Sequence, residues 1–232
     1  MNIRILQLIE GARQARGLTV VIDVFRAMTV EAFLSYNHAA HVIPVGDVQA
    51  AFDYRSAHPG TLLCGERGGK IIDGFDFGNS PSQVEHIDLT GKTIVHTTSA
   101  GTQGIANAVH AEEIIGGSLV TARAIAEYIR QKNPAEVSLV CMGLAGRTET
   151  DEDTLCARYI RSLLENEPLA DMEAEIRRLA ETDGAKFFDP AQQSVFPQRD
   201  FELSTQLDRF SFVLRYCPET GEMERVEVPG GC

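Results

Sequence analysis

The chain has 232 residues, of which 44% are hydrophobic, enough to fill the core of one large domain or two small ones. Its 33 acidic and 21 basic residues give a formal net charge of -12. This balance, without any basic run, argues against a nucleic-acid partner, because phosphate backbones are bound by clustered Lys and Arg. Small anions stay possible as ligands, since the local charge of a site can oppose that of the whole chain.

The amino-terminal stretch Met1–Gly17 is interrupted by charged residues and lacks the apolar core of a signal peptide. No apolar stretch approaches the ~20 residues needed to cross a bilayer. Five cysteines are scattered without Cys-x-x-Cys spacing, namely Cys64, Cys141, Cys156, Cys217 and Cys232. Scattered cysteines of odd number fit reduced thiols. These features predict a globular cytoplasmic protein without a membrane partner.

From Asn2 to about Cys141, short apolar runs alternate with helical patterns. The predicted strands are Leu18–Val24, His41–Val45, Thr61–Cys64, Thr93–His96, Glu113–Ile115 and Val137–Cys141. The predicted helices are Ala27–Tyr36, Asp47–Ser56, Thr102–His110 and Ser118–Gln131. Such alternation favours a largely parallel sheet covered by helices on both faces.

The glycine-rich stretch Glu66–Pro81 breaks this rhythm, and long irregular loops inside compact domains are usually functional or disordered. Its residues Phe75 and Phe77 favour an ordered, packed loop.

Beyond Asp151 the pattern turns helical, with helices expected over Asp153–Glu165 and Asp171–Glu181, the second capped by Asp171 and closed by Gly184. Phe210–Tyr216 and Met223–Val228 then predict a hairpin. We therefore expect an α/β fold with three α/β/α layers, a largely parallel mixed sheet, and a carboxy-terminal helical segment plus β-hairpin. Residues 1–232 are taken as a single α/β domain, with a possible subdivision near residue 150.

Four predicted strands lead into polar segments that could bind phosphate or a metal, namely Asp23–Arg26, Glu66–Gly69, Thr97–Thr102 and Asp151–Asp153. In an open α/β sheet the residues past the carboxyl ends of parallel strands line one crevice. One shared site is therefore expected.

Each segment also has a purely structural interpretation. Asp23 could bind a metal and Arg26 a phosphate, but the two could equally form an ion pair or a helix cap. Glu66 and Arg67 repeat this combination, with a solvated turn as the alternative. The hydroxyls and glycine of Thr97–Thr102 could bind an anion at a helix start or simply cap that helix. The acids of Asp151–Asp153 could bind Mg²⁺ or complement the helix dipole.

A rival signal is the Cys-x5-Arg-Thr pattern of Cys141, Arg147 and Thr148, which matches cysteine-dependent phosphatases. A core cysteine is the simpler interpretation of Cys141. His96 ends a strand beside the hydroxyl-rich turn and could transfer protons, although a single histidine there is more often a core residue.

Taken together, five ordered motifs between about Leu18 and Ile160 resemble the 2-phosphosulfolactate phosphatase family of Mg²⁺-dependent enzymes. They are Val21–Ala27, Cys64–Gly69, Gly74–Pro81, Thr97–Thr102 and Glu152-Asp153 followed by Ala157. The chain departs from the family at Ser99-Ala100, where many members have one asparagine. The resemblance implicates Asp23, Arg26, Glu66, Asn79, Ser80, Thr97, Thr98, Gly101, Thr102, Glu152 and Asp153.

The leading hypothesis is a Mg²⁺-dependent phosphatase that hydrolyses a small anionic phosphomonoester such as 2-phospho-3-sulfolactate. The catalytic set expected is Asp23, Arg26, Glu66, Glu152 and Asp153, of which the four carboxylates are the candidate metal ligands. The expected substrate-binding residues are Arg67, Asn79, Ser80, Thr97, Thr98, Ser99, Gly101 and Thr102. The alternatives are a thiol-dependent phosphatase using Cys141 and Arg147, and a non-catalytic phosphate- or nucleotide-binding protein. A homodimer is possible.

Overall fold

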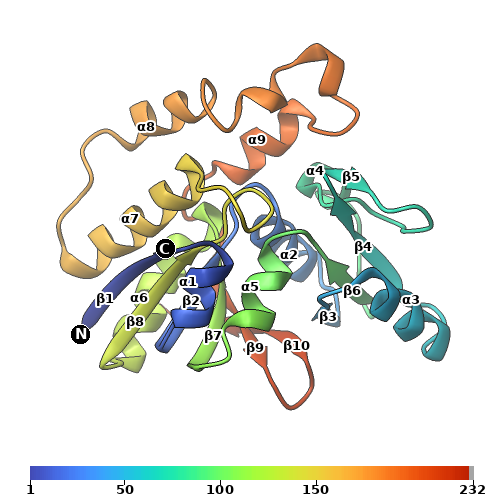
Figure 1. Cartoon of the computed structure of the whole chain (residues 1–232), viewed down its shortest axis with the longest axis horizontal. Helices are drawn as coiled ribbons and strands as arrows, with labels where there is room; N and C mark the ends of the chain where they lie inside the picture. Colours follow the sequence, from blue (N-terminus) through green and yellow to red (C-terminus); the bar gives the residue numbers. More distant parts are fainter. Residues whose placement is uncertain (230–232) are drawn as a thin grey trace.

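The computed structural model describes residues 1–229, and in this range the strands form two sheets where the sequence pattern suggested one (Figure 1). The larger sheet has the order β1-β8-β2-β7-β9-β10. Its strands are β1 (Asn2–Gln7), β2 (Gly17–Ile22), β7 (Ala111–Gly117), β8 (Glu136–Cys141), β9 (Phe212–Cys217) and β10 (Glu222–Glu227). The smaller sheet has the order β3-β6-β4-β5. Its strands are β3 (His41–Pro44), β4 (Leu62–Arg67), β5 (Lys70–Ile71) and β6 (Thr93–Thr97).

Most neighbouring strands run parallel, as the alternation of strands and helices predicts. Strands β1, β8, β2 and β7 pair in parallel, and the antiparallel hairpin β9-β10 joins the free edge of β7. In the smaller sheet β3, β6 and β4 are parallel and β5 turns back on β4. The α/β class with a mixed, largely parallel arrangement is confirmed.

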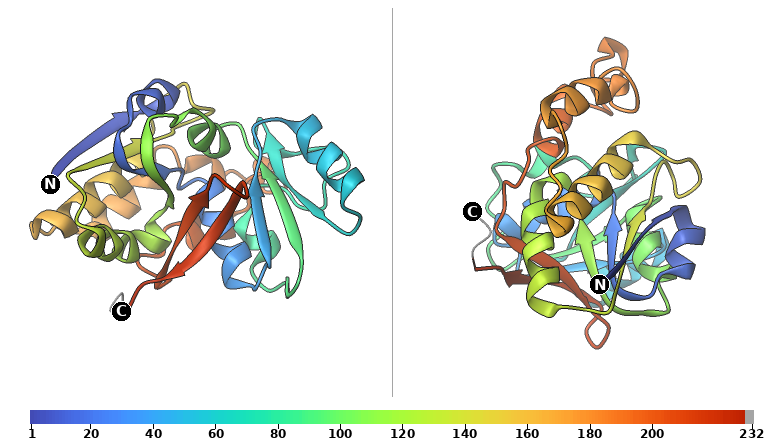
Figure 2. Two further views of the ribbon diagram at one scale, coloured as in Figure 1. Left: turned by 90° about the horizontal axis from the view of Figure 1, so that it is seen from below. Right: turned by 90° about the vertical axis from the view of Figure 1, so that its left-hand side faces the viewer.

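Helices cover both faces of the larger sheet because β2 is apolar on both sides. Val21 packs in a cluster with residues of α1 (Leu8–Gln14), α2 (Ala27–Tyr36) and the region of α5 (Gly101–Asn107). Val20 and Ile22 point the other way, into a cluster with α6 (Ala122–Lys132) and α7 (Asp151–Glu165). This alternation is the two-residue period of a strand buried between two layers (Figure 2).

The smaller sheet shares the first of these clusters, because Val42, Cys64 and Ile94 also pack there with α2. Its outer face is covered by α3 (Val48–Ala57), where Ala51 meets Leu63 and Val95. Helix α2 therefore has apolar partners in both sheets. This packing explains the split: β2 already has β7 and β8 as neighbours, so β3, β4 and β6 assemble separately around α2.

The glycine-rich stretch after β4 is ordered, as Phe75 and Phe77 suggest. Strand β4 continues to Arg67 and pairs with β5, and the short helix α4 (Pro81–Val84) follows. The Phe75 ring is buried and meets the Phe52 ring edge-on, with ring centroids 5.4 Å apart.

The carboxy-terminal segment crosses the top of the molecule in Figure 1. Helix α8 (Met172–Leu179) is capped as predicted, since Asp171 Oδ1 accepts a bond from the Ala174 amide and the Gly184 amide donates to the Leu179 carbonyl. The short helices η2 (Ala185–Phe187), η3 (Pro190–Gln192) and α9 (Gln198–Ser204) were not predicted. Neither were β1 and α1, whereas the short η1 (Leu119–Thr121) lies within the predicted helix Ser118–Gln131. Aromatic residues of the segment pack on Leu155 of α7 and so fix the segment over the strand ends.

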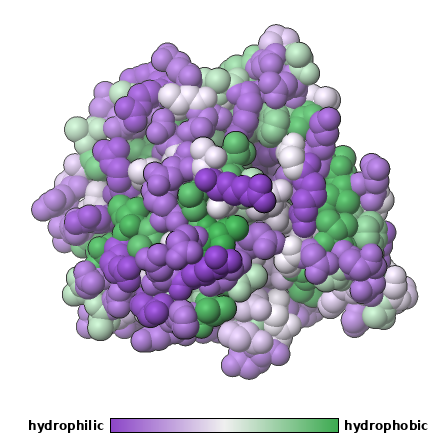
Figure 3. Space-filling view, in the orientation of Figure 1, coloured by the Kyte–Doolittle hydropathy of each residue, from purple (hydrophilic) through white to green (hydrophobic). Residues whose placement is uncertain are grey.

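No helix among residues 1–229 is long and apolar enough to span a membrane. On the face shown in Figure 3, polar and charged residues predominate and apolar residues form separate patches. Cys64, Cys141 and Cys156 are buried free thiols and Cys217 is partly exposed. The remaining cysteine, Cys232, lies outside the described residues.

Candidate active site

A cavity of about 380 Å³ opens at the carboxyl ends of strands from both sheets. Asp23 follows β2, Glu66 lies near the end of β4, and Ser99 follows β6. Glu152 lies in the first turn of α7, which the chain reaches from β8. Six of the predicted site residues line this cavity: Asp23, Arg26, Glu66, Asn79, Ser99 and Glu152. The expected convergence of strand ends therefore occurs, although the strands belong to two sheets.

Asp23 lies at the floor of the cavity and is only 6% exposed. Its Oδ1 accepts a hydrogen bond from the Ala27 amide at 3.1 Å. Burial raises the pKa of Asp23 to about 6, and the negative charge of Glu66 acts in the same direction. Gly101 packs so closely that a Cβ there would lie 3.0 Å from Asp23 Oδ2 and 2.6 Å from the Ala27 methyl group. The glycine is thus needed for the fit of α5 against Asp23.

Glu66 ties two loops together at the cavity wall. Its Oε1 accepts from the Ser99 amide and its Oε2 from the Gly69 amide, both at 2.7 Å. Gly69 has a φ of +83, and a Cβ there would overlap the ring of Phe196. The loop after β4, the turn after β6 and the carboxy-terminal segment therefore hold one another in place.

The adjacent acids Glu152 and Asp153 differ in their surroundings. Asp153 does not line the cavity, and its two oxygens accept from the Val24 and Gly143 amides at 2.8 Å each. It joins the loops that follow β2 and β8. Glu152 faces the cavity, and its Oε2 is buried without a hydrogen-bond partner. Burial raises the pKa of Glu152 to about 7, against the opposing effect of the Lys186 ammonium.

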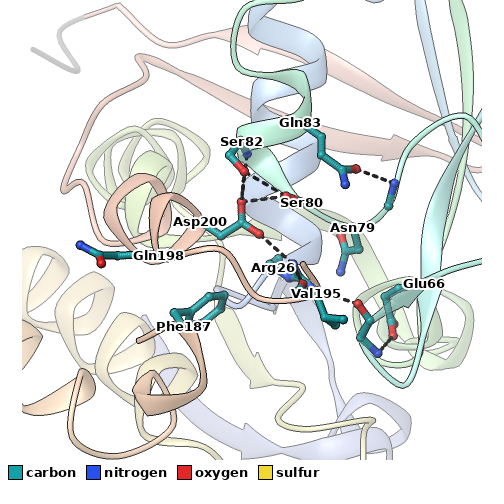
Figure 4. Close-up of polar contacts among 12 residues, drawn as sticks. Arg26, Glu66, Asn79, Ser80, Ser82, Gln83, Phe187, Val195, Gln198 and Asp200 are labelled. Atoms are coloured by element: carbon teal, nitrogen blue, oxygen red, sulfur yellow. Dashed lines mark hydrogen bonds and ion pairs between the residues drawn. The ribbon is translucent and has the colours of Figure 1, made fainter. Parts of the chain in front are cut away.

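Arg26 is paired with a residue that sequence patterns did not single out, Asp200 of α9 (Figure 4). Its Nη1 donates to Asp200 Oδ2 at 2.7 Å and to the Val195 carbonyl, and its Nη2 donates to the Gly69 carbonyl. Both charged side chains are almost fully buried. An ion pair was one of the two interpretations of Arg26, but the partner is Asp200 and not Asp23. The pair neutralises the Arg26 charge at the cavity edge.

The other oxygen of Asp200 is also fully used. Asp200 Oδ1 accepts from the Ser80 hydroxyl at 2.8 Å and from the Ser82 hydroxyl at 2.6 Å. Ser80 therefore lies behind Arg26 and does not line the main cavity. These contacts attach α9 to the amino-terminal end of α4.

Most of the hydroxyl-rich turn after β6 bonds to itself. The Thr98 amide donates to Thr102 Oγ1 at 3.0 Å, and the Thr102 amide donates to Thr98 Oγ1 at 3.2 Å. Thr97 Oγ1 accepts from Arg67. The predicted residues of this region that do not line the cavity are Arg67, Thr97, Thr98, Gly101 and Thr102. Only Ser99 and its neighbour Ala100 line it, so backbone capping accounts for Thr98 and Thr102.

Cys141 and Arg147, the pair of the rival signal, do not line the cavity. The Cys141 thiol is buried and donates to the Asp153 carbonyl at 3.4 Å, and burial raises its pKa well above the usual value. Arg147 is exposed. His96 lies behind the cavity, where Nδ1 contacts Glu31 Oε1 at 2.8 Å and Nε2 contacts Asn79 Oδ1 at 3.3 Å. His96 thus helps to orient the Asn79 side chain.

Sequence patterns also missed residues that line the cavity itself. Lys186 and Phe196 come from the carboxy-terminal segment, Phe25 follows Asp23, and Thr150 precedes α7. No motif marks Lys186 in the sequence. The only signal that could have led to Lys186 is a general one: a site that binds an anion needs a cationic group as well as acids.

The acids of the cavity fit a divalent cation, although among residues 1–229 no three Asp, Glu, His or Cys side chains are grouped closely enough to form a metal site alone. Mg²⁺ needs only one or two protein carboxylates, because water and substrate phosphate complete its shell. The unpartnered Glu152 oxygen and the repulsion between Asp23 and Glu66 would both be relieved by a cation. Glu66 and Asp153 each accept two amide hydrogen bonds, but only Glu66 lines the cavity, so Asp153 is the least suited of the four predicted ligands.

Comparison with known proteins agrees with the resemblance seen in the sequence. The family model described as 2-phosphosulpholactate phosphatase matches residues 3–218. A probable 2-phosphosulfolactate phosphatase of Thermotoga petrophila is 38% identical over 64% of this chain, and the match spans 63% of that protein's length. Proteins of the same description from Caldanaerobacter subterraneus and Bacillus subtilis are 33% and 26% identical, each over 90% of this chain and over 80% and 91% of their own lengths. The chain belongs to the 2-phosphosulpholactate phosphatase family.

Proposed function

We propose that this protein is a Mg²⁺-dependent phosphatase that hydrolyses a small, multiply anionic phosphomonoester. The substrate class follows from the names of its relatives, which point to 2-phospho-3-sulfolactate, with 3-sulfolactate and inorganic phosphate as products. The observation that carries the proposal is the cavity at the strand ends, which Asp23, Glu66 and Glu152 all line, together with a buried Glu152 oxygen that has no hydrogen-bond partner.

Asp23 and Glu66 are the residues that we expect to hold Mg²⁺, because both line the cavity and the charge of Glu66 acts on the Asp23 carboxylate. A bound Mg²⁺ would neutralise charge on the phosphoryl oxygens, which lowers the barrier to attack. The Ser99 side chain and the Asn79 amide also face the cavity and could donate hydrogen bonds to the phosphoryl group. Lining glycines allow the backbone to approach a ligand closely.

Glu152 is suited to act as the general base. Its pKa of about 7 means that it can accept a proton near neutral pH and release it again. It would take a proton from the water whose oxygen attacks phosphorus. The bond between phosphorus and the alcohol oxygen then breaks, the departing alkoxide takes up a proton from solvent water, and Glu152 returns its proton to the solvent. The products are the free alcohol and inorganic phosphate.

The test is phosphate release from a panel of phosphorylated 2-hydroxy acids, measured with Mg²⁺, after complete chelation, and after Mg²⁺ is restored. We expect turnover with Mg²⁺, loss on chelation and recovery on restoration. Turnover that survives complete chelation would contradict the metal requirement. Tight calorimetric binding of the esters without any phosphate release would instead support the non-catalytic alternative.

A further inference from the structure

The cavity is lined by two cationic side chains, Arg26 and Lys186, and they are not equivalent. The Arg26 charge is balanced by Asp200 at 2.7 Å, with both side chains buried. Lys186 makes no ion pair within the part of the chain that the structure describes. It therefore presents to the cavity a positive charge without a directly paired carboxylate, although the charge acts on nearby Glu152.

Lys186 is held at the cavity wall by aromatic rings. Its ammonium lies 5.5 Å from the ring centroids of Phe187 and Phe196 and 5.8 Å from that of Phe25. Ring faces attract a cation, and an apolar surrounding strengthens its attraction for an anion, because less water screens the charge. Lys186 is only partly exposed, in keeping with this enclosure.

The position of Lys186 differs from that of the groups assigned to the phosphoryl end. Asp23, Glu66 and Ser99 stand on the strand ends, whereas Lys186 stands on η2 of the carboxy-terminal segment. The Lys186 charge acts on Glu152 of α7, where it lowers the pKa against the effect of burial. An ester bound with its phosphoryl group at the strand ends could place its alcohol portion beside the part of the wall that carries Lys186.

We propose that Lys186 binds a second acidic group of the substrate, a carboxylate or sulfonate on the alcohol portion, and so selects esters that carry one. This inference rests on the proposed function. A single ammonium between phenyl rings offers charge without the planar fork of an arginine, so it should accept either acid. The selection is for charge and not for the shape of one acid group.

The experiment compares the wild type with K186M and K186R on three esters in the presence of Mg²⁺. Isopropyl phosphate carries only the phosphate, 2-phospholactate adds a carboxylate, and 2-sulfoethyl phosphate adds a sulfonate. We expect K186M to lose about 10- to 100-fold more kcat/KM on the two charged esters than on isopropyl phosphate, mainly through KM, as loss of a charge-assisted bond predicts. K186R should recover most of the difference. The exposed Lys92 provides the matched control K92M, which should leave the preference unchanged.

Equal losses by K186M on all three esters would overturn the proposal, because Lys186 would then act on the phosphoryl group. The proposal would also be overturned if K186M kept the wild-type preference for the two charged esters over isopropyl phosphate. If the wild type releases phosphate from none of the esters, the proposed phosphatase activity is wrong. The role of Lys186 is then tested by ligand binding instead of turnover. Calorimetry with 3-sulfolactate should then show at least about tenfold weaker binding to K186M than to the wild type. Equal binding, or none to either protein, would overturn the proposal.

Discussion

The two walls of the cavity were visible in the sequence to very different degrees. The strand-end wall, with Asp23, Glu66 and Ser99, carries recognisable motifs after predicted strands. The carboxy-terminal wall, with Lys186 and Phe196, carries none, yet it supplies a lysine that forms no ion pair among residues 1–229. Motifs mark groups whose backbone setting is local, such as strand ends and helix starts. A side chain delivered by a distant segment leaves no such mark.

The same contrast holds for the hydroxyl-rich turn after β6. Its four hydroxyls suggested a phosphate cradle, but Thr98 and Thr102 bond each other's backbone amides. A turn rich in polar side chains can therefore be explained by backbone capping, and such a composition is not by itself evidence for a bound ligand. The following substitutions test whether the two walls do different work.

The largest effect is expected at the strand-end wall, from D23N. The change keeps the shape of the side chain and removes its charge, so kcat should fall by about 10²- to 10⁴-fold while the fold remains intact. Steady-state kinetics measure kcat, and circular dichroism checks that the fold is intact. D47N is the control, because Asp47 caps α3 away from the cavity and its loss should leave turnover unchanged. A D23N enzyme with near-normal kcat would remove Asp23 from the site.

The carboxy-terminal wall should respond to D200A mainly through stability. The change leaves the buried Arg26 charge unpaired, so the free energy of unfolding should fall by about 3–5 kcal/mol in urea denaturation. The control D189A removes the cap of η3 in the same segment and should cost only about 0.5–2 kcal/mol. If D200A is no less stable than D189A, then the Arg26–Asp200 pair does not hold this wall in place.

Between the walls, E152Q should change the pH dependence of stability in the absence of divalent ions. The folded protein keeps a proton on Glu152 up to a pKa of about 7, whereas the unfolded chain releases it near 4.5, so this group makes stability fall as pH rises between those values. E152Q should therefore be more stable than the wild type by about 1–3 kcal/mol at pH 8 and equal to it below pH 4. Urea denaturation in EDTA measures this. The exposed neighbour gives the control E149Q, which should follow the wild type at every pH. If the stability of E152Q also follows that of the wild type at every pH, then burial does not disfavour the Glu152 charge.

The smallest effect is expected from C141S, because Cys141 is buried and does not line the cavity. Its buried thiol donates to a carbonyl and has a pKa raised by burial, so it is not set up as a nucleophile. Turnover should stay within about threefold of the wild type. A loss of several hundredfold with intact folding would revive the thiol-dependent alternative.

The sequence by itself determined the alternation of strands and helices, the hairpin at the carboxyl end and the acids at the strand ends. These features are local: a period of two or of 3.6 residues, a cap such as Asp171, or a turn such as that ending at Gly221 depends on neighbours along the chain. The family resemblance also rested on such short ordered motifs, and the match over residues 3–218 confirms it.

Only the tertiary structure decided which strands share a sheet, which of the two acids at Glu152 and Asp153 faces the cavity, and which partner neutralises Arg26. Each depends on pairing between segments far apart in sequence, as in the contact of Arg26 with Asp200. Adjacent residues on α7 point in different directions, so one turn of helix sends Asp153 to backbone amides and places Glu152 at the cavity with one buried oxygen unpaired. Packing and burial set these outcomes, and neither is encoded in the spacing of residue types.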